Sequence, residues 1–213
     1  MNLRYVLRCM VVATLVLAIG LTQSSALARG TRAALDDAPL APTADAPIIV
    51  DHTSTDITAI PQQWIEAAKA DLHIAYGHTS HGSQLTTGMN GLVDFANGGG
   101  LGLAFPENYL EWNNDGSDGA LHLHDYAMGG DVGYYPQWVE NTRDYLGEPN
   151  AQGRGSDHPE INVIIWSWCG QASDRSEQGM IDTYLDPMTA LEEEYFGVTF
   201  VYMTGHADGS GEE

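Results

Sequence analysis

The pattern of apolar and polar positions divides the chain after residue 47 into alternating strands and helices. Continuous apolar runs, which are typical of buried strands, occupy residues 47–51, 72–77, 161–168 and 198–204. Apolar residues recur at helical spacing in 60–72, 83–96, 136–146 and 176–196. This alternation predicts an α/β domain built in layers around a mainly parallel sheet.

Several residues refine these boundaries. Pro61 and Pro136 suit the first turn of the helices that they open, and Ser83 suits the N-cap of the helix over 83–96. Pro187 predicts an interruption of the helix over 176–196. Residues 101–134 show no period, so we expect a long functional loop or an insertion there.

Three predicted strands end in polar, glycine-rich clusters. These clusters are "GHTSHGS" (77–83), "WCGQASD" (168–174) and "TGHADGSG" (204–211). Ligands of α/β sheets bind beyond the carboxyl ends of the strands, and parallel strands bring these ends to one edge. The sequence therefore predicts one site to which all three clusters contribute.

The first cluster is a turn from strand to helix, where backbone amides favour negative charge. A serine in such a turn is well placed as a nucleophile, although the G-x-S-x-G motif is absent. Ser80 is the best candidate, because Thr79 is β-branched, Ser83 is explained by capping, and Gly82 allows close approach of a substrate. The alternative is that Ser80 only caps the helix.

"IAYGHTSHGSQL" resembles the first block of the SGNH/GDSL hydrolases, in a variant where H-x-S-x-G replaces Gly-Asp-Ser. The resemblance rests on His78, Ser80 and Gly82. It implies a three-layer α/β/α fold with a flavodoxin-like sheet, and a secreted serine hydrolase that cleaves esters through an acyl-enzyme without a cofactor. Acetyl groups on polysaccharides, or smaller esters, are the expected substrates.

The resemblance also assigns the remaining catalytic roles. Gly133 of "GDVG" and Gln171 of "WCGQ" take the positions of the oxyanion-hole donors, with Gln171 replacing the family's Asn. The family's Asp-x-x-His block is absent, so His206 is the candidate base. The ending of the chain resembles a strand entering an unfinished loop. We therefore expect a fragment whose C-terminal part is absent, and the alternative to His206 is a base in that absent part.

Five further residues are candidates for contact with a substrate, and two of them also fit a metal site. The candidates for substrate binding are His78, His81, His122, His124 and Trp112. His122 and His124 lie on one face of an extended segment and, with Asp125, form a half-site for a metal. A metal-dependent hydrolase and a non-catalytic carbohydrate-binding surface protein are therefore the rival functions.

The N-terminal segment predicts secretion. Residues 1–28 combine Arg4 and Arg8, a short apolar core and an "ALA" cleavage site, as in a signal peptide. Residues 29–47 are rich in Ala, Pro and Asp and predict a disordered leader, which leaves 48–213 as the hydrolase domain. After cleavage no membrane association is expected.

Charge and cysteine content narrow the possible partners. The chain has 8 basic and 29 acidic residues and a net charge of −21, which disfavours nucleic acids and anionic membranes. Cys169 is the only cysteine after the signal peptide, so its thiol is either free and buried or lacks its partner in this chain. The sequence carries no indication of oligomeric state.

Overall fold

The structure, a computed structural model, describes residues 48–205. The chain divides into two units at residues 57 and 58. In the described part of the first unit, a short 3-10 helix spans His52–Ser54, and Asp51 caps it by accepting a hydrogen bond from the Thr53 amide at 2.8 Å. The strand predicted over 47–51 is wrong for its described residues, which are exposed and form no ladder with another strand.

The second unit is built around five parallel strands in the order β2-β3-β1-β4-β5. The strands span His73–Gly77 (β1), Trp112–Asn113 (β2), Leu121–Asp125 (β3), Val163–Trp166 (β4) and Thr199–Val201 (β5). Ala75 at the centre of β1 pairs with His124 on one side and Ile164 on the other. The order β3-β1-β4-β5 matches the first four strands of the flavodoxin-like order, with β2 added at the edge. The predicted α/β fold with a parallel sheet is confirmed.

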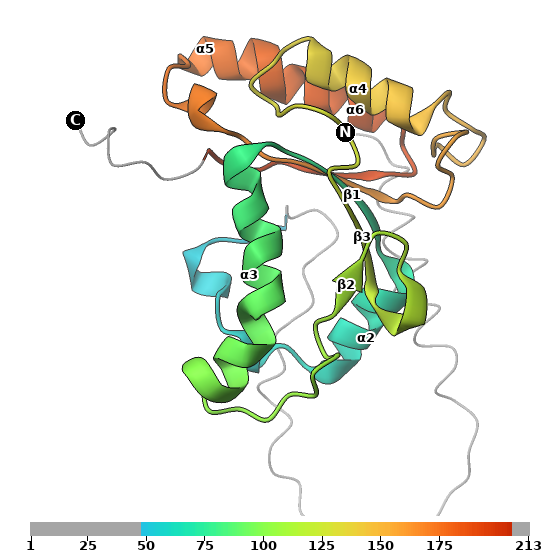
Figure 1. Cartoon of the computed structure of the whole chain (residues 1–213). Helices are drawn as coiled ribbons and strands as arrows, with labels where there is room; N and C mark the ends of the chain where they lie inside the picture. Colours follow the sequence, from blue (N-terminus) through green and yellow to red (C-terminus); the bar gives the residue numbers. More distant parts are fainter. Residues whose placement is uncertain (1–47, 206–213) are drawn as a thin grey trace, which may run out of the picture. The chain divides into compact units, whose positions relative to one another are not determined.

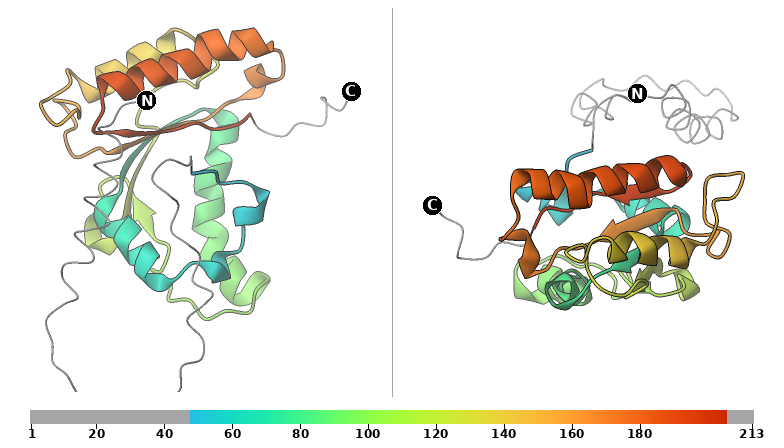
Figure 2. Two further views of the ribbon diagram at one scale, coloured as in Figure 1. Left: turned by 180° about the vertical axis from the view of Figure 1, so that it is seen from behind. Right: turned by 90° about the horizontal axis from the view of Figure 1, so that it is seen from above.

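Helices cover both faces of this sheet (Figures 1 and 2). They span Gln62–Asp71 (α2), Ser83–Asp94 (α3), Gln137–Leu146 (α4), Glu177–Met180 (α5) and Asp186–Glu194 (α6). On one face, α4 and α6 bury Trp138, Leu146, Met188 and Leu191 against Ile164 and Trp166 of β4. On the other face, Leu85 and Met89 of α3 pack against Ile74, Tyr76 and Leu123. The result is the predicted arrangement of three layers.

The sequence did not reveal β3, a central strand inside the segment predicted as a loop. Its apolar residues alternate with His122 and His124, and the pattern is too short and too polar to predict a buried strand. The structure accommodates both imidazoles on the face that α4 covers. His122 contacts His73, and His124 contacts the hydroxyl of Tyr145 at 3.1 Å.

The sequence predicts one helix or two over 176–196, and the α-helical pattern is indeed interrupted just before Pro187, although the chain stays helical between Glu177 and Glu194. A π-helical turn, Ile181–Leu185, joins α5 to α6, and Pro187 lies at the beginning of α6. The missing amide of proline costs little at this position, because the wider turn changes the local hydrogen-bond pattern.

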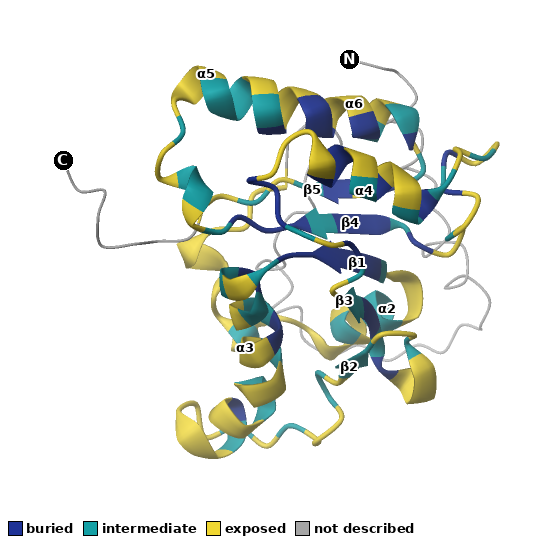
Figure 3. Cartoon of the chain, turned by 45° about the horizontal axis from the view of Figure 1, so that its top comes forward, coloured by how far each residue is buried: buried dark blue, intermediate teal, exposed yellow. Residues whose placement is uncertain are grey.

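The predicted apolar face of α2 is not buried. Trp64 in its first turn is 62% exposed, and Figure 3 shows that much of α2 is exposed or only partly buried. Within the described residues, no helix has the length and the apolar character that crossing a membrane requires.

Candidate functional site

Polar segments that follow β1, β3 and β4 meet at the carboxyl edge of the sheet. These three strands are direct neighbours and run parallel, so Gly77 lies opposite Trp166, and Tyr76 lies opposite Asp125. The carboxyl end of β5 lies beside that of β4. The predicted convergence of strand ends is confirmed, while His206 lies outside the described residues.

Ser80 occupies a strained turn between β1 and α3. It is exposed and has a φ of 20°, which is unusual for a residue other than glycine. A 3-10 turn, Ser80–Gly82 (η3), leads directly into α3. The hydroxyl of Ser83 donates a hydrogen bond to the carbonyl of Ser80 at 2.6 Å, so it braces the turn and does not cap the helix as predicted.

Gly82 lets this turn pack tightly against the end of β4. A Cβ atom at Gly82 would overlap with the side chains of His78 and Ser167. The carbonyl of Gly82 accepts a hydrogen bond from the hydroxyl of Tyr76 at 2.9 Å. Burial raises the pKa of Tyr76, so this hydroxyl remains a donor around neutral pH. The turn that carries Ser80 is therefore held from both sides.

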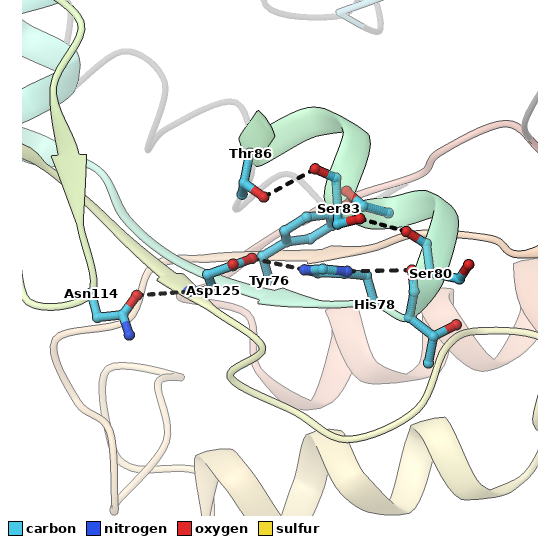
Figure 4. Close-up of polar contacts among 9 residues, drawn as sticks. Tyr76, His78, Ser80, Ser83, Thr86, Asn114 and Asp125 are labelled. Atoms are coloured by element: carbon cyan, nitrogen blue, oxygen red, sulfur yellow. Dashed lines mark hydrogen bonds and ion pairs between the residues drawn. The ribbon is translucent and has the colours of Figure 1, made fainter. Parts of the chain in front are cut away.

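His78 is buried beneath the turn, with only 1% of its surface exposed. Its Nε2 atom lies 2.7 Å from Oδ1 of Asp125, beside the ring of Tyr76 (Figure 4). The ring centroid of His78 lies 4.3 Å from that of Tyr76 and 4.0 Å from that of Tyr126. The backbone amide of Asp125 in turn donates to Oδ1 of Asn114. This burial leaves His78 almost no surface that a substrate could reach in this structure. His78 instead supports the turn.

Asp131 is a site residue that the sequence analysis missed. It is 1% exposed, and its carboxylate accepts hydrogen bonds from the Gly133 amide at 2.9 Å and from the Thr79 hydroxyl at 2.5 Å. It thereby ties the loop after β3 to the turn after β1. The amide of Gly133, predicted as an oxyanion donor, is already engaged by this carboxylate. The sequence "GDVG" could have indicated Asp131. A carboxylate that is buried needs hydrogen-bond donors nearby, and the backbone amides of this loop are such donors.

Gly133 and Gln171 lie against each other, as the site prediction requires. A Cβ atom at Gly133 would lie 2.5 Å from Cδ of Gln171. Gln171 belongs to the 3-10 turn Gly170–Ala172 (η6), which follows β4. Its Oε1 atom is buried without a hydrogen-bond partner among the described residues. The amide of Gln171 thus reaches the loop that holds Gly133.

Arg175 brings a positive charge to this edge, which the sequence analysis also missed. Its guanidinium donates to the carbonyl of Gly133 at 2.6 Å and lies 5.8 Å from the ring centroid of Trp168. The contacts orient the guanidinium, and the charge favours an anion or a developing oxyanion nearby.

His81 and Cys169 form a pair of a thiol and an imidazole in the described site. Nδ1 of His81 lies 3.0 Å from Sγ of Cys169. The contact with His81 is the main cause that lowers the pKa of the Cys169 thiol. Cys169 is partly exposed, whereas a free thiol was expected to be buried. The predicted substrate contact of His81 stays a prediction.

Three other predicted substrate contacts lie away from Ser80. His122 is 8% exposed and pairs with His73 at the beginning of β1, roughly 13 Å along the strand from its carboxyl end. His124 faces α4 and Tyr145. Trp112 donates to Asn90 at the far end of α3, beside a cleft of about 560 Å³. The structure does not bring these residues into one site with Ser80.

Comparisons with protein-family models, with curated proteins and with solved structures found no match for this chain. Within residues 48–205, no group of three or more His, Cys, Asp or Glu side chains has the geometry to hold a metal ion. The case for a function therefore rests on the chemistry of the carboxyl edge itself.

Proposed function

We propose that the carboxyl edge is the active site of a secreted ester hydrolase with Ser80 as its nucleophile. The observation that carries this proposal is the conformation of Ser80, an exposed serine with a φ of 20° on a turn between a parallel strand and a helix. Strained turns of this kind expose nucleophilic serines in other hydrolases. The contacts of Gly82, His78 and Asp131 around the turn resist its relaxation.

In the proposed reaction, Oγ of Ser80 attacks the carbonyl carbon of an ester and forms an acyl-enzyme, and the alcohol leaves. Water then attacks the acyl group and restores the serine. The side-chain amide of Gln171 stabilises the oxyanion, and Arg175 adds favourable charge at the same edge. His206 accepts and returns the proton in this proposal, because Gly205, the residue before it, lies against Ala172 of η6, next to Gln171.

Acetyl esters on polysaccharides are the proposed substrates. Thr79 ties the turn to Asp131 in the loop that holds Gly133, and Gln171 of η6 lies against Gly133, an arrangement that suits a small acyl group. The net charge of −21 disfavours polyanionic substrates. A neutral, acetylated sugar chain meets both conditions.

The test compares two serines of the same turn in the full-length protein. Ser80→Ala should lower kcat for p-nitrophenyl acetate by at least about 10³-fold and leave the melting temperature almost unchanged. Ser83→Ala should cost about 1 kcal/mol of stability, because it removes one hydrogen bond, and should retain most of the activity. Turnover close to that of the wild type in Ser80→Ala would refute the assignment of the nucleophile.

A further inference from the structure

The pair formed by Cys169 and His81 has no role in the proposed ester hydrolysis, yet it has the geometry of an activated thiol. Sγ and Nδ1 are 3.0 Å apart, within hydrogen-bonding distance. Cys169 lies three residues after the end of β4 and is the N-cap residue of the turn η6, while His81 lies in the turn η3. The two residues are 88 positions apart in the chain, and the sheet brings them together.

The surroundings of the sulfur favour its negative charge. The imidazole of His81 contributes most to lowering the pKa of Cys169, and the backbone amides of Gly170 and His81 and the hydroxyl of Thr79 add to this effect. Burial acts in the opposite direction. His81 is the one titratable group among these contacts. A cysteine that is buried among apolar groups would have a raised pKa and would be inert.

We propose that Cys169 and His81 form a reactive thiolate–imidazolium pair and that hydroperoxides oxidise this thiolate to a sulfenic acid. Partial exposure gives a small peroxide access to the sulfur. The other histidine of the same segment, His78, is bound to Asp125 and buried, so it does not compete for the thiol. The proposal concerns the sulfur alone and does not depend on ester hydrolysis.

The step balances with hydroperoxide as the oxidant. Sulfur attacks the terminal oxygen of the peroxide, so that an S–O bond forms and the O–O bond breaks. The departing oxygen takes the proton from Nδ1 of His81 and leaves as water or an alcohol. Sulfur is oxidised by two electrons, and the peroxide is reduced by two. An added thiol reverses the modification.

The experiment uses the full chain with Cys9→Ser, so that Cys169 is its only thiol. The rate of iodoacetamide alkylation is measured against pH for the folded protein and for the same protein in guanidinium chloride. Its midpoint should lie below about 8.5 in the folded state and near that value when unfolded. This comparison needs no further variant. Equal midpoints in the two states would overturn the proposal.

Two variants then test the partner and the oxidation. His81→Gln should slow alkylation at pH 7 about tenfold, because loss of the imidazole raises the pKa of the thiol and lowers the fraction of thiolate. His158→Gln, a change at a histidine bonded to Glu160, is the matched control and should leave the rate unchanged. After treatment with hydrogen peroxide, dimedone should label Cys169 in the parent and about tenfold more slowly in His81→Gln. No dimedone adduct in the parent, or equal rates in His81→Gln, would overturn the proposal.

Discussion

The histidines at the carboxyl edge and at the amino edge of the sheet contact different kinds of side chain. At the carboxyl edge, His78 lies against the carboxylate of Asp125, and His81 lies against the thiol of Cys169. At the amino edge, His73 lies against His122, with their Nδ1 atoms 2.8 Å apart and their rings nearly perpendicular. Each histidine of the carboxyl edge has an acidic partner, whereas those of the amino edge have each other.

This difference affects which histidines can hold a proton. Two imidazoles that share a hydrogen bond need one donor and one acceptor, so at least one of them must keep a nitrogen without a proton. Burial, and then the neighbouring His73, lower the pKa of His122 and favour its neutral form. An imidazole beside a thiol or a carboxylate can instead hold a proton and stabilise the negative partner. Because the strands are parallel, the two histidines with acidic partners lie at the same edge of the sheet. These are the histidines that can take part in proton transfer.

The substitution expected to disturb the carboxyl edge most strongly is a change of Gly82 in the turn that carries Ser80. Gly82→Ala places a methyl group where His78 and Ser167 already lie, and overpacking of this kind costs about 1–3 kcal/mol. We also expect ester hydrolysis to fall, since the change displaces the turn of Ser80. Thermal melting and p-nitrophenyl acetate hydrolysis measure both effects.

The matched control is Gly88→Ala in the adjoining helix α3. A Cβ atom at Gly88 meets no other atom within 4 Å, so this variant should gain about 0.5–1 kcal/mol from the higher helix propensity of alanine. A Gly82→Ala variant that is as stable and as active as Gly88→Ala would show that the turn is not tightly packed.

The sequence predicted the carboxyl edge better than the amino edge. Three strands are continuous apolar runs, and their polar ends follow from the polarity of a parallel sheet, so the grouping of Ser80 with Gln171 was accessible. The strand β3 was not, because its histidines interrupt the apolar pattern. Their partners could not be foreseen without knowing that β3 lies beside β1.

The side-chain pairs within the site were also beyond the sequence. Thr79 and Asp131 are 52 positions apart, and His81 and Cys169 are 88 positions apart. Their contacts depend on the direction in which each side chain leaves its loop. A motif can indicate which residues gather at an edge, but it does not determine which of two neighbouring histidines faces a thiol and which is buried.

The pH dependence of stability tests the pair of His73 and His122 at the amino edge. Because the pKa of His122 is lower in the folded protein than the value of about 6.5 in the unfolded chain, the unfolded chain binds more protons between these two values. This contribution to stability is complete above about pH 6.5 and is lost as the pH falls toward the folded pKa.

Urea unfolding at pH 7.5 and at pH 5.5 measures this effect. The wild type should lose more free energy of unfolding between the two pH values than His122→Gln, in which the titrating ring is absent. Titrating groups outside this pair are common to both proteins and cancel in the difference, so the comparison reports on His122 together with His73. An equal loss in the two proteins would mean that the pair of His73 and His122 does not contribute to the pH dependence of stability.

The substitution with the smallest expected effect, Trp112→Phe, tests most directly whether the two edges act independently. Trp112→Phe keeps an aromatic ring on β2 and removes the hydrogen bond from the indole to Asn90, at a cost of about 0.5–1.5 kcal/mol. Hydrolysis of p-nitrophenyl acetate should stay within about a factor of two of the wild type, since Trp112 lies at the far end of α3 from Ser80. The matched change at the carboxyl edge, Gln171→Ala, should lower kcat about 10²-fold by removing an oxyanion donor. If Trp112→Phe lowered kcat as much as Gln171→Ala, the two edges would be parts of one catalytic site, and the division drawn between them would be wrong.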